Sequence, residues 1–440
     1  MDKMNLLLKK NLVLFLLLFL PLLKVFAAEQ IIINYADRLS VENTTDVNTR
    51  ALFGNVQITQ GNVLLTCEKA IQYMLANKIE LERKVVITQN NLTLKAPYVI
   101  YNGNTYIAEA SKGVEISDKD AKLVADRGNY STQTNIADFY DNVKFTDDSV
   151  TIYCEYINHN RNTEDSKAEG NVLIKGNQTN VFLIADKVIN IANENYSIVT
   201  GNPVLYQIDT IVVSSHDTTE SQLSEAIEFD TLIVKADTIE AFRGKENEHY
   251  HFYGNVEIIK KNISAIAQDA YFYKNREEII LRNKPIIWYD SSQLHADSIN
   301  ILLSNNEVKK IHSINNAIAI TLNDTNNLSR KDQLAGNEIE IIFSSDSTRN
   351  IKSFGNAKSV YFMLTEGVAD GVIKNSAEKI LIDIAKDGIE NIVLINQVPG
   401  EYTPEPMVFG KEKEFFLPDF KFNDENKPVK PDVLLEKYFR

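Results

Sequence analysis

The 440-residue sequence has two cysteines and six histidines, and these small numbers exclude several kinds of site. Cys67 and Cys154 cannot build a disulfide framework, and neither lies in a CxxC pair, so a zinc ribbon and a thioredoxin-type redox site are excluded. His249 and His251 share one face of an alternating segment, but no third ligand stands nearby at metal spacing. We therefore predict no metal site and no cofactor.

Catalytic motifs are also absent from the sequence. It contains no GxSxG, no HExxH and no glycine-rich phosphate loop, and its one tryptophan, Trp288, lies in the ordinary strand pattern PIIWYD. Acids recur after a small residue at Asp126, Asp186, Asp237 and Asp297, which indicates outward solubilising side chains rather than a catalyst. We predict no catalytic residue and no enzyme, since an active site should be a departure from the pattern in one place.

After its first 27 residues the sequence has no long apolar run. Those residues carry lysines, an apolar stretch over 12–20 and small residues Val25 and Ala27, which is typical of a cleaved signal peptide. A retained anchor helix is the alternative, but the stretch is shorter than the roughly 20 residues that cross a bilayer. Cleavage leaves 42 of 46 basic and 59 of 60 acidic side chains, a net charge of −17, which excludes a nucleic-acid binder.

What the sequence does have is a repeat. Taking the first apolar residue of each strand as origin, five copies follow at 29-residue steps, and weaker copies extend the array to about ten units between residues 50 and 400. The five regular origins are Val56, Val85, Val114, Val143 and Val172. Such a period indicates units that bury an apolar face only against their neighbours.

Each repeat reads as two β-strands. The origin and the residue two beyond it are apolar, while residues between them are polar, such as Gln57, Glu115 and Lys144. A second apolar pair follows about ten residues later and ends at a small residue, which is Cys67 or Cys154 in two repeats and mostly alanine elsewhere. The cysteines are therefore expected to be small core residues rather than reactive thiols.

The sequence predicts an elongated all-β fold of two sheets with one strand of each repeat in each sheet. Gly-Asn pairs before several origins, such as Gly54-Asn55, predict corners or bulges in long strands. The predicted layout is a signal peptide (1–27), a first repeat region (28–208), an inserted exposed loop or short surface helix (209–230), a second repeat region (231–398) and a proline-rich tail (399–440).

The combination of G-N-V, L-x-A-D about ten residues later and a following tyrosine, as in VADRGNY (124–130), resembles the OstA-like family of lipopolysaccharide-transport proteins, which includes LptA. The resemblance covers roughly residues 30–400. It implies an open, V-shaped β-jellyroll in the periplasm, possible association with the outer membrane, and an apolar interior that shields lipopolysaccharide acyl chains. The residues that strand phase directs into this interior are Val56, Ile58, Val85, Ile87, Val114, Ile116, Val143, Phe145, Val172 and Ile174.

The first strand of the array is barely charged over Ile31, Ile32 and Ile33 and suits pairing with the edge of another sheet. The resemblance implies lipopolysaccharide or a related glycolipid as ligand, and LptC-like and LptD-like envelope proteins as strand-edge partners. Two other classes fit the same features: a non-catalytic β-repeat adhesin or envelope structural protein, and a carbohydrate-active β-helix enzyme.

Overall fold

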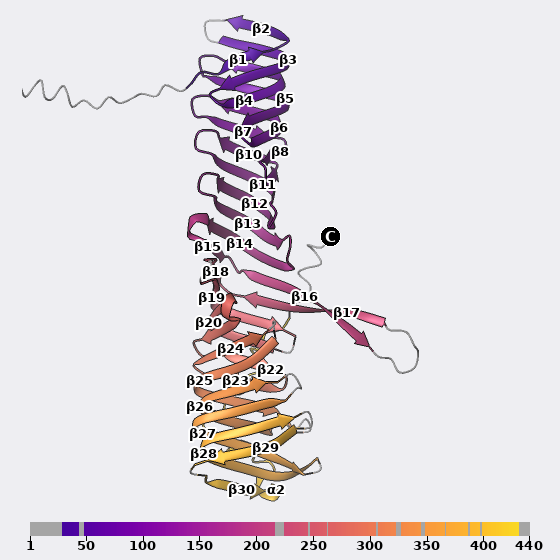
Figure 1. Cartoon of the computed structure of the whole chain (residues 1–440), viewed down its shortest axis with the longest axis vertical. Coiled ribbons are helices and arrows are strands. Elements are labelled where there is room, and N and C mark those ends of the chain that lie inside the picture. Colours follow the sequence, from indigo (N-terminus) through magenta and orange to yellow (C-terminus); the bar gives the residue numbers. More distant parts are fainter. Residues whose placement is uncertain are drawn as a thin grey trace, which may run out of the picture. The chain divides into compact units, whose positions relative to one another are not determined.

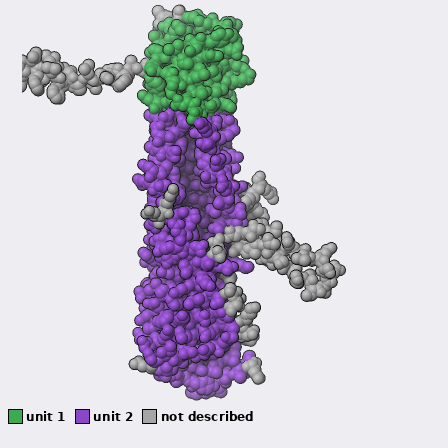
Figure 2. Space-filling view, viewed as in Figure 1, with its two compact units in different colours: residues 1–110, 131–133 green, residues 111–130, 134–440 purple. Residues whose placement is uncertain are grey.

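The computed structural model describes residues 29–430 except for short gaps, and the predicted signal peptide, 1–27, lies outside the described residues. The gaps are 44–47, 216–223, 245–246, 262, 305–306, 323–326, 345–347, 366, 386–387 and 397. The chain divides into two compact units. Unit 1 comprises residues 1–110 and 131–133, and unit 2 comprises 111–130 and 134–440 (Figure 2).

The described residues are almost entirely β-strand (Figure 1), which confirms the predicted all-β fold. Unit 1 holds β1 (Ile32–Tyr35), β2 (Arg38–Asn43), β3 (Asn48–Gln60), β4 (Val63–Tyr73), β5 (Lys78–Gln89), β6 (Leu92–Asn102) and nearly all of β7 (Ile107–Ser111). The strands that follow are β8 (Val114–Ser117), β9 (Lys122–Ala125), β10 (Arg127–Ser131), β11 (Ile136–Thr146), β12 (Val150–Asn160), β13 (Asp165–Gly176), β14 (Val181–Ile191), β15 (Tyr196–Thr200), β16 (Val204–Ser215), β17 (Ser224–Lys235), β18 (Thr238–Phe242), β19 (His249–Lys260), β20 (Ile263–Tyr273), β21 (Glu278–Arg282), β22 (Ile286–Tyr289), β23 (Ser292–His295), β24 (Ser298–Ser304), β25 (Glu307–Leu322), β26 (Lys331–Phe343), β27 (Arg349–Thr365), β28 (Val368–Ala385), β29 (Gly388–Ile395) and β30 (Gly400–Pro404). Short helices are η1 (Ala192–Glu194), η2 (Lys274–Arg276), α2 (Glu405–Val408) and η3 (Glu412–Phe415).

Most long strands bend once, so that each belongs to two sheets. In β3 the register shifts between Phe53 and Val56: residues 56–60 pair with β1 and the first half of β4, while 48–53 pair with β2 and the second half of β4. We call the segments on the Val56 side of the bend sheet I and those on the other side sheet II. The same bend recurs in β5, β11, β13, β19, β26 and β27.

Gly-Asn pairs make these corners, as their positions in the sequence predict. Gly54 and Asn55 have φ of 73° and 44°, in the left-handed region where glycine has no steric penalty and asparagine has a small one. The same conformation occurs at Gly170-Asn171, Gly254-Asn255 and Gly355-Asn356. The corner reverses the direction in which the sheet faces and lets one strand contribute to both walls.

The predicted register of one strand per repeat in each sheet is wrong. Residues 56–60 and 63–67 belong to one repeat and both lie in sheet I, where 63–67 then pairs with 85–89 of the next repeat. Each repeat therefore places two strand segments in each sheet. One strand passes from sheet I around a corner into sheet II, and the next strand returns from sheet II around another corner into sheet I. At about 4.8 Å per strand this doubles the length that each repeat adds to the array.

The core lies between the two sheets in each unit. In unit 1 the inward side chains include Leu52, Leu65, Leu81 and Val99, each at most 1% exposed. In unit 2 one apolar cluster extends from Ala185 to Ile380. Its buried alanines are Ala185, Ala236, Ala265, Ala267, Ala270, Ala296, Ala317, Ala357 and Ala377. Ala185, Ala236, Ala267 and Ala296 occupy small-residue slots that the repeat predicts, and all four are buried.

Two segments differ from the predicted layout. The first is 209–230, which contains the far ends of β16 and β17; these strands pair from Val204↔Lys235 to Ser215↔Ser224 as a long hairpin (Figure 1). The boundary between the compact units also lies elsewhere than between the two predicted repeat regions, because it follows Ala110. The predicted proline-rich tail begins with β30 and α2, and its residues from Val408 to Leu417 pack against β27 and β28 within unit 2. Among the described residues, no helix is long and apolar enough to cross a membrane.

Candidate functional site

The structure directs all ten predicted interior residues toward the core, but it does not bury them equally. In unit 1, Val56, Ile58 and Ile87 are 0% exposed and Val85 is 1% exposed. In unit 2, Val114, Ile116, Val143 and Val172 are buried, whereas Phe145 and Ile174 are only half-buried. Unit 1 is therefore filled by its own side chains, while access to the interior increases along β11 to β13.

The mouth of each unit is the side opposite the corners, where the hairpin turns of both sheets lie. In unit 1 side chains at the strand ends close it. Gln60, at the end of a sheet I strand, donates from Nε2 to the carbonyl oxygen of Gly103 at 2.7 Å and accepts from the Tyr101 hydroxyl at 2.6 Å. One repeat later, Gln89 donates to the carbonyl oxygen of Thr132 at 2.7 Å. Buried bonds of this kind hold the two walls together.

In unit 2 two contacts across the mouth lie far apart along the array. Near its beginning, Asp118 of sheet I pairs with Arg161 at the end of a sheet II strand, at 3.7 Å. Farther on, Asp290 pairs with Arg349 at 3.3 Å, and the Tyr289 and Phe343 rings meet edge to face with centroids 5.4 Å apart. On the sheet I side, the strands from β11 to β20 lie between these two contacts.

Between the two contacts, unit 2 is hollowed. Figure 2 shows this hollow between two columns of atoms in the upper part of unit 2, at the level of β11 to β14 in Figure 1. On the sheet I side, the half-buried inward residues nearest the mouth are Phe145, Ile152, Ile174 and Leu183, which are opposed in the ladder as Phe145↔Ile152 and Ile174↔Leu183. We call these four residues the apolar wall.

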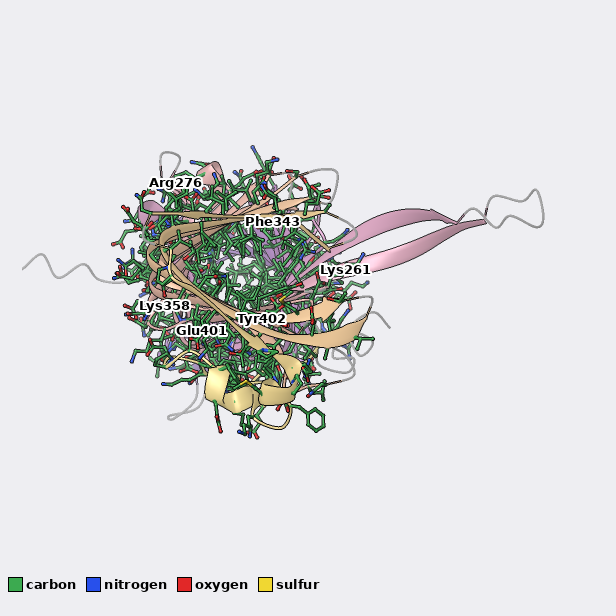
Figure 3. All side chains as sticks on the ribbon, turned by 90° about the horizontal axis from the view of Figure 1, so that it is seen from below. Lys261, Arg276, Phe343, Lys358, Glu401 and Tyr402 are labelled. Atoms are coloured by element: carbon green, nitrogen blue, oxygen red, sulfur yellow. The ribbon has the colours of Figure 1, made fainter. Side chains whose placement is uncertain are left out.

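At the level of β19 and β20 the two walls of the mouth end in different kinds of connection. Lys261 lies in the turn at the sheet I side and Arg276 in η2 at the sheet II side, and Figure 3 shows the two on different sides of the molecule. Inward residues here, such as Ile258, Ile263, Tyr250 and Phe272, are again half-buried and pack at the margin of the core. Half-buried inward residues therefore also occur on β19 and β20.

The sheet II side of the same opening carries a polar row that sequence reasoning missed. His159, Ser166, Asn190 and Ser197 are directly opposed across β12 to β15 and face inward, two residues nearer the mouth than the buried row of Ile157 and its partners. Its bonds are His159 Nδ1 to Ser166 Oγ at 2.9 Å and Ser197 Oγ to Asn190 Oδ1 at 3.0 Å. In the sequence, the only feature that could have predicted this row is the presence of polar residues at positions that strand alternation directs inward.

Arg243 completes this polar row at the rim. Its guanidinium donates to Ser197 Oγ at 2.8 Å and to Asn190 Oδ1 at 2.6 Å, and its side chain is exposed. Burial, together with the nearby Arg161 charge, lowers the pKa of His159, so its imidazole is neutral at neutral pH. The opening thus has one apolar side and one side of neutral polar groups edged by guanidinium groups.

The recurring acids have a structural role at the corners. Asp126, Asp237 and Asp297 are exposed, and each accepts a hydrogen bond from the side chain of a corner asparagine: Asn142 at 2.7 Å, Asn255 at 3.0 Å and Asn316 at 2.9 Å. Asp186 lies against the corner residue Gly201, where an added Cβ would come within 2.5 Å of it. These acids brace corners, a role that their exposure alone does not reveal.

Both cysteines are free and buried, as expected for small core residues. Burial raises the pKa of Cys67 to about 11 and that of Cys154 to about 12, so both thiols stay protonated at neutral pH. His249 and His251 lie on the outer face of β19 and stack on neighbouring rings, with His251 and Tyr271 centroids 4.2 Å apart. Within the described parts of the chain, no cluster of three or more His, Cys, Asp or Glu side chains is arranged to hold a metal ion.

Two of the three predicted edge residues, Ile32 and Ile33, lie on β1 of unit 1, and Ile31 directly precedes this strand. Ile31 is buried, Ile33 is half-buried opposite Ile58, and Ile32 is 59% exposed, and β1 pairs with β3. On β2, the inward Leu39 is 54% exposed, opposite the fully buried Leu52. This end of unit 1 therefore presents apolar side chains beside an edge strand.

The bent antiparallel strands, the inward apolar pairs and the mouth opposite the corners define a β-jellyroll-like all-β protein. Residues 28–181 match the family model described as OstA-like protein, so the chain contains an OstA-like region, and the resemblance that the repeats predict is confirmed over these residues. The solved structure of LptH from Pseudomonas aeruginosa, titled as the LptA-homologous periplasmic component of the lipopolysaccharide transport device, matches with 14% identity and a TM-score of 0.23, covering 31% of this chain and 94% of that one. No curated protein matches the chain.

Proposed function

We propose that the opening of unit 2 binds the acyl chains of lipopolysaccharide or a related glycolipid, and that the protein carries this lipid through the periplasm toward the outer membrane without catalysing a reaction. The observation that carries the proposal is the half-buried state of Phe145 and Ile174, because their repeat equivalents Ile58 and Ile87 are fully buried. An apolar surface accessible from one side suits a lipid tail. The OstA-like match over 28–181, which includes these residues, supports the same function.

The two sides of the opening match the two halves of such a lipid. Acyl chains lie against the apolar wall, where burial contributes roughly 25 cal/mol per Å² of apolar surface. The polar row offers hydroxyl, amide and imidazole groups to the part where the acyl chains join the sugar. Arg161 and Arg243 at the rim place guanidinium groups where phosphate or carboxylate substituents of the head lie, which suits their bidentate geometry.

The remaining predicted interior residues, Val56, Ile58, Val85, Ile87, Val114, Ile116, Val143 and Val172, belong to the same inward face. We propose that Val114, Ile116, Val143 and Val172 form the floor of the opening in unit 2, that the other four residues belong to the closed interior of unit 1, and that direct contact with lipid is made mainly by Phe145 and Ile174. The eight residues are at most 7% exposed, so they contact a ligand only when the mouth opens.

Photo-crosslinking tests this function. A benzophenone amino acid at Ile174 should capture purified lipopolysaccharide under ultraviolet light, whereas the same group at Lys144, which is exposed and faces outward, should not. Mass spectrometry of the adduct identifies the lipid. Equal capture at both positions, or none at either, contradicts the proposal and favours the packed structural repeat.

We also propose that β1 and β2 pair with an LptC-like protein and that β29 and β30, at the other end of the chain, pair with an LptD-like protein. Leu39 and Ile32 are more than half exposed beside an edge strand, and such edges pair or are protected. Leu39→Glu should abolish pull-down of an LptC-like partner. Leu75→Glu, at a turn residue 79% exposed in unit 1, is the matched control and should bind as the parent does.

A further inference from the structure

The C-terminal tail follows the outer face of sheet I in unit 2, running back along the array. Val408 of α2 is fully buried against Val360, Phe362 and Val372. Leu417 then donates its N–H to Gln333 Oε1 at 2.8 Å. The tail thus starts at β27 and β28 and proceeds toward β26.

Farther along, the tail bonds to side chains on β23, β22 and β20. Asn423 exchanges two hydrogen bonds with Gln293, at 2.8 and 3.0 Å, and its carbonyl oxygen accepts from Trp288 Nε1 at 3.1 Å. Ser264 Oγ donates to the carbonyl oxygen of Pro428 at 3.5 Å. The described part of the tail ends two residues later, at Lys430.

These sheet residues form one row of directly opposed positions, each at most 7% exposed although the row lies on the outer face. The row consists of Ser264, Trp288, Gln293, Ile320, Gln333 and Val360. The tail crosses this row strand by strand, and it accounts for the burial of side chains that face away from the core.

The buried row continues past the last described residue of the tail. Ladder pairing extends it from Ser264 through Ile259, Ile233 and Tyr206 to Phe182, which are 6%, 1%, 2% and 6% exposed. The four residues form a small apolar cluster of their own, separate from the core cluster. Neighbours on one sheet face stand side by side and cannot cover each other's tips, so another segment lies over them.

Chain length indicates which segment this is. The tail takes six residues, from Leu417 to Asn423, to pass from Gln333 to Gln293, and five, from Asn423 to Pro428, to pass from Gln293 to Ser264. Each step spans two strand spacings, which is about 10 Å. Four further strands therefore need about ten to twelve residues, and twelve follow Pro428 in the sequence.

We infer that residues 431–440, PDVLLEKYFR, bind over the cluster of Phe182, Tyr206, Ile233 and Ile259. Five of these ten residues are apolar: Val433, Leu434, Leu435, Tyr438 and Phe439. The contact continues the one already made by residues 408–428 and ends at the next residue of the row, Lys175, which is exposed. Leu183 and Leu205, next to Phe182 and Tyr206, face the interior, so the bound segment supports a wall of the proposed lipid site from outside.

Disulfide trapping tests this inference directly. In a Cys67→Ala and Cys154→Ala background, Ile233→Cys is combined with a cysteine at Val433, Leu434 or Leu435 in turn. At least one pair should form an intramolecular disulfide under mild oxidation. Ile198→Cys, on the outer face of sheet II, is the control and should form none with the same three positions. No bond with Ile233→Cys, or only disulfide-linked dimers, overturns the inference, dimers indicating a second copy instead.

Truncation after Lys430 provides an independent test that needs no lipid. The shortened chain should bind bis-ANS more strongly than the full chain, and a synthetic peptide of residues 431–440 should reverse this increase. In the truncated chain, Ile233→Asp should abolish the effect of the peptide while the far-ultraviolet circular dichroism stays unchanged. Equal dye binding by full and truncated chains overturns the inference; lipid capture at Ile174 is measured separately, so failure of the proposed function is distinguishable.

Discussion

The mouth of unit 1 and the opening of unit 2 are built from the same repeat, yet one is closed and the other is accessible. Ile87 and Ile174 are three repeats apart, of the same residue type, and inward in both cases, but Ile87 is 0% exposed and Ile174 is half-buried. The difference lies at the strand ends. Gln60 in unit 1 bonds across the mouth, whereas its equivalent in unit 2, Asp147, accepts hydrogen bonds from the backbone of its own turn.

The comparison teaches that access to the interior is set by a few side chains at the rim rather than by the residues that line it. Gln60 and Gln89 reach the opposite wall because an uncharged amide both donates and accepts, and its bonds are buried. A carboxylate at the same place only accepts, and here it caps a turn. At this position of the repeat, Gln60 and Gln89 accompany a packed interior and Asp147 accompanies an accessible one, whereas Asp118 caps its own turn and also reaches the opposite wall through its ion pair with Arg161.

The sharpest way to break the comparison is to truncate the two equivalent isoleucines. Ile87→Ala should lower the free energy of unfolding by about 2–5 kcal/mol, because it opens a cavity in a packed core. Ile174→Ala should lower it by about 1 kcal/mol, because part of that side chain is already in contact with water. Urea unfolding followed by circular dichroism measures both, and equal losses contradict the assignment of a closed and an open region.

The second-largest expected effect on the free energy of unfolding comes from variants of the residues at the mouth, Gln60 and Asp147. Gln60→Ala should cost about 1–3 kcal/mol, since it removes the buried donor to the Gly103 carbonyl and leaves the Tyr101 hydroxyl with Thr132 Oγ1 as its remaining partner. Asp147→Ala removes only hydrogen bonds within a turn and should cost about 1 kcal/mol or less. Hydrogen exchange of unit 1 amides is the second readout, and it should quicken for Gln60→Ala alone.

A pH titration sharpens the comparison at the polar row. The pKa of His159 is lowered in the folded protein, chiefly by burial and further by Arg161, so the unfolded chain binds the proton more readily. Its contribution to stability is present above the unfolded value of about 6.5 and is lost as pH falls through the folded value. His159→Gln should flatten this loss as the pH falls below about 6.5. A parallel shift of the whole curve, with its slope unchanged, would show that His159 does not titrate there.

The smallest expected difference concerns the two thiols, one in each unit. Cys67 and Cys154 are 5% and 7% exposed, and burial raises the pKa of both. Both should therefore react slowly with iodoacetamide at pH 8 and fast in 6 M guanidinium chloride, with native rates that are similar to each other. Fast native labelling at Cys154 alone would mean that the opening reaches deeper than the apolar wall.

The sequence predicts the strands, the corners and the inward face well, because each depends on residues close together in the chain. Val56 and Ile58 are inward by simple alternation, and Gly54-Asn55 marks its own bend. The number of strands per sheet was mispredicted, because the 29-residue period covers a path out and back and periodicity does not show where the chain reverses. The closure at Gln60 and Tyr101 joins residues 41 apart, and the contact of Pro428 with Ser264 joins residues 164 apart. No local pattern encodes such pairs.

The acid that supports each corner has a consequence for how the chain can change in evolution. Asn142 donates a hydrogen bond to Asp126, and Asn255 donates one to Asp237, so each of these corner hydrogen bonds joins residues less than one period apart. The loss or duplication of a whole 29-residue period therefore leaves the corner hydrogen bonds of the other repeats intact. The length of the chain can then change by whole periods. The tail is the exception: its residues 408–428 are matched to a set number of strands, so between β20 and β28 a period cannot be gained or lost without also changing the tail.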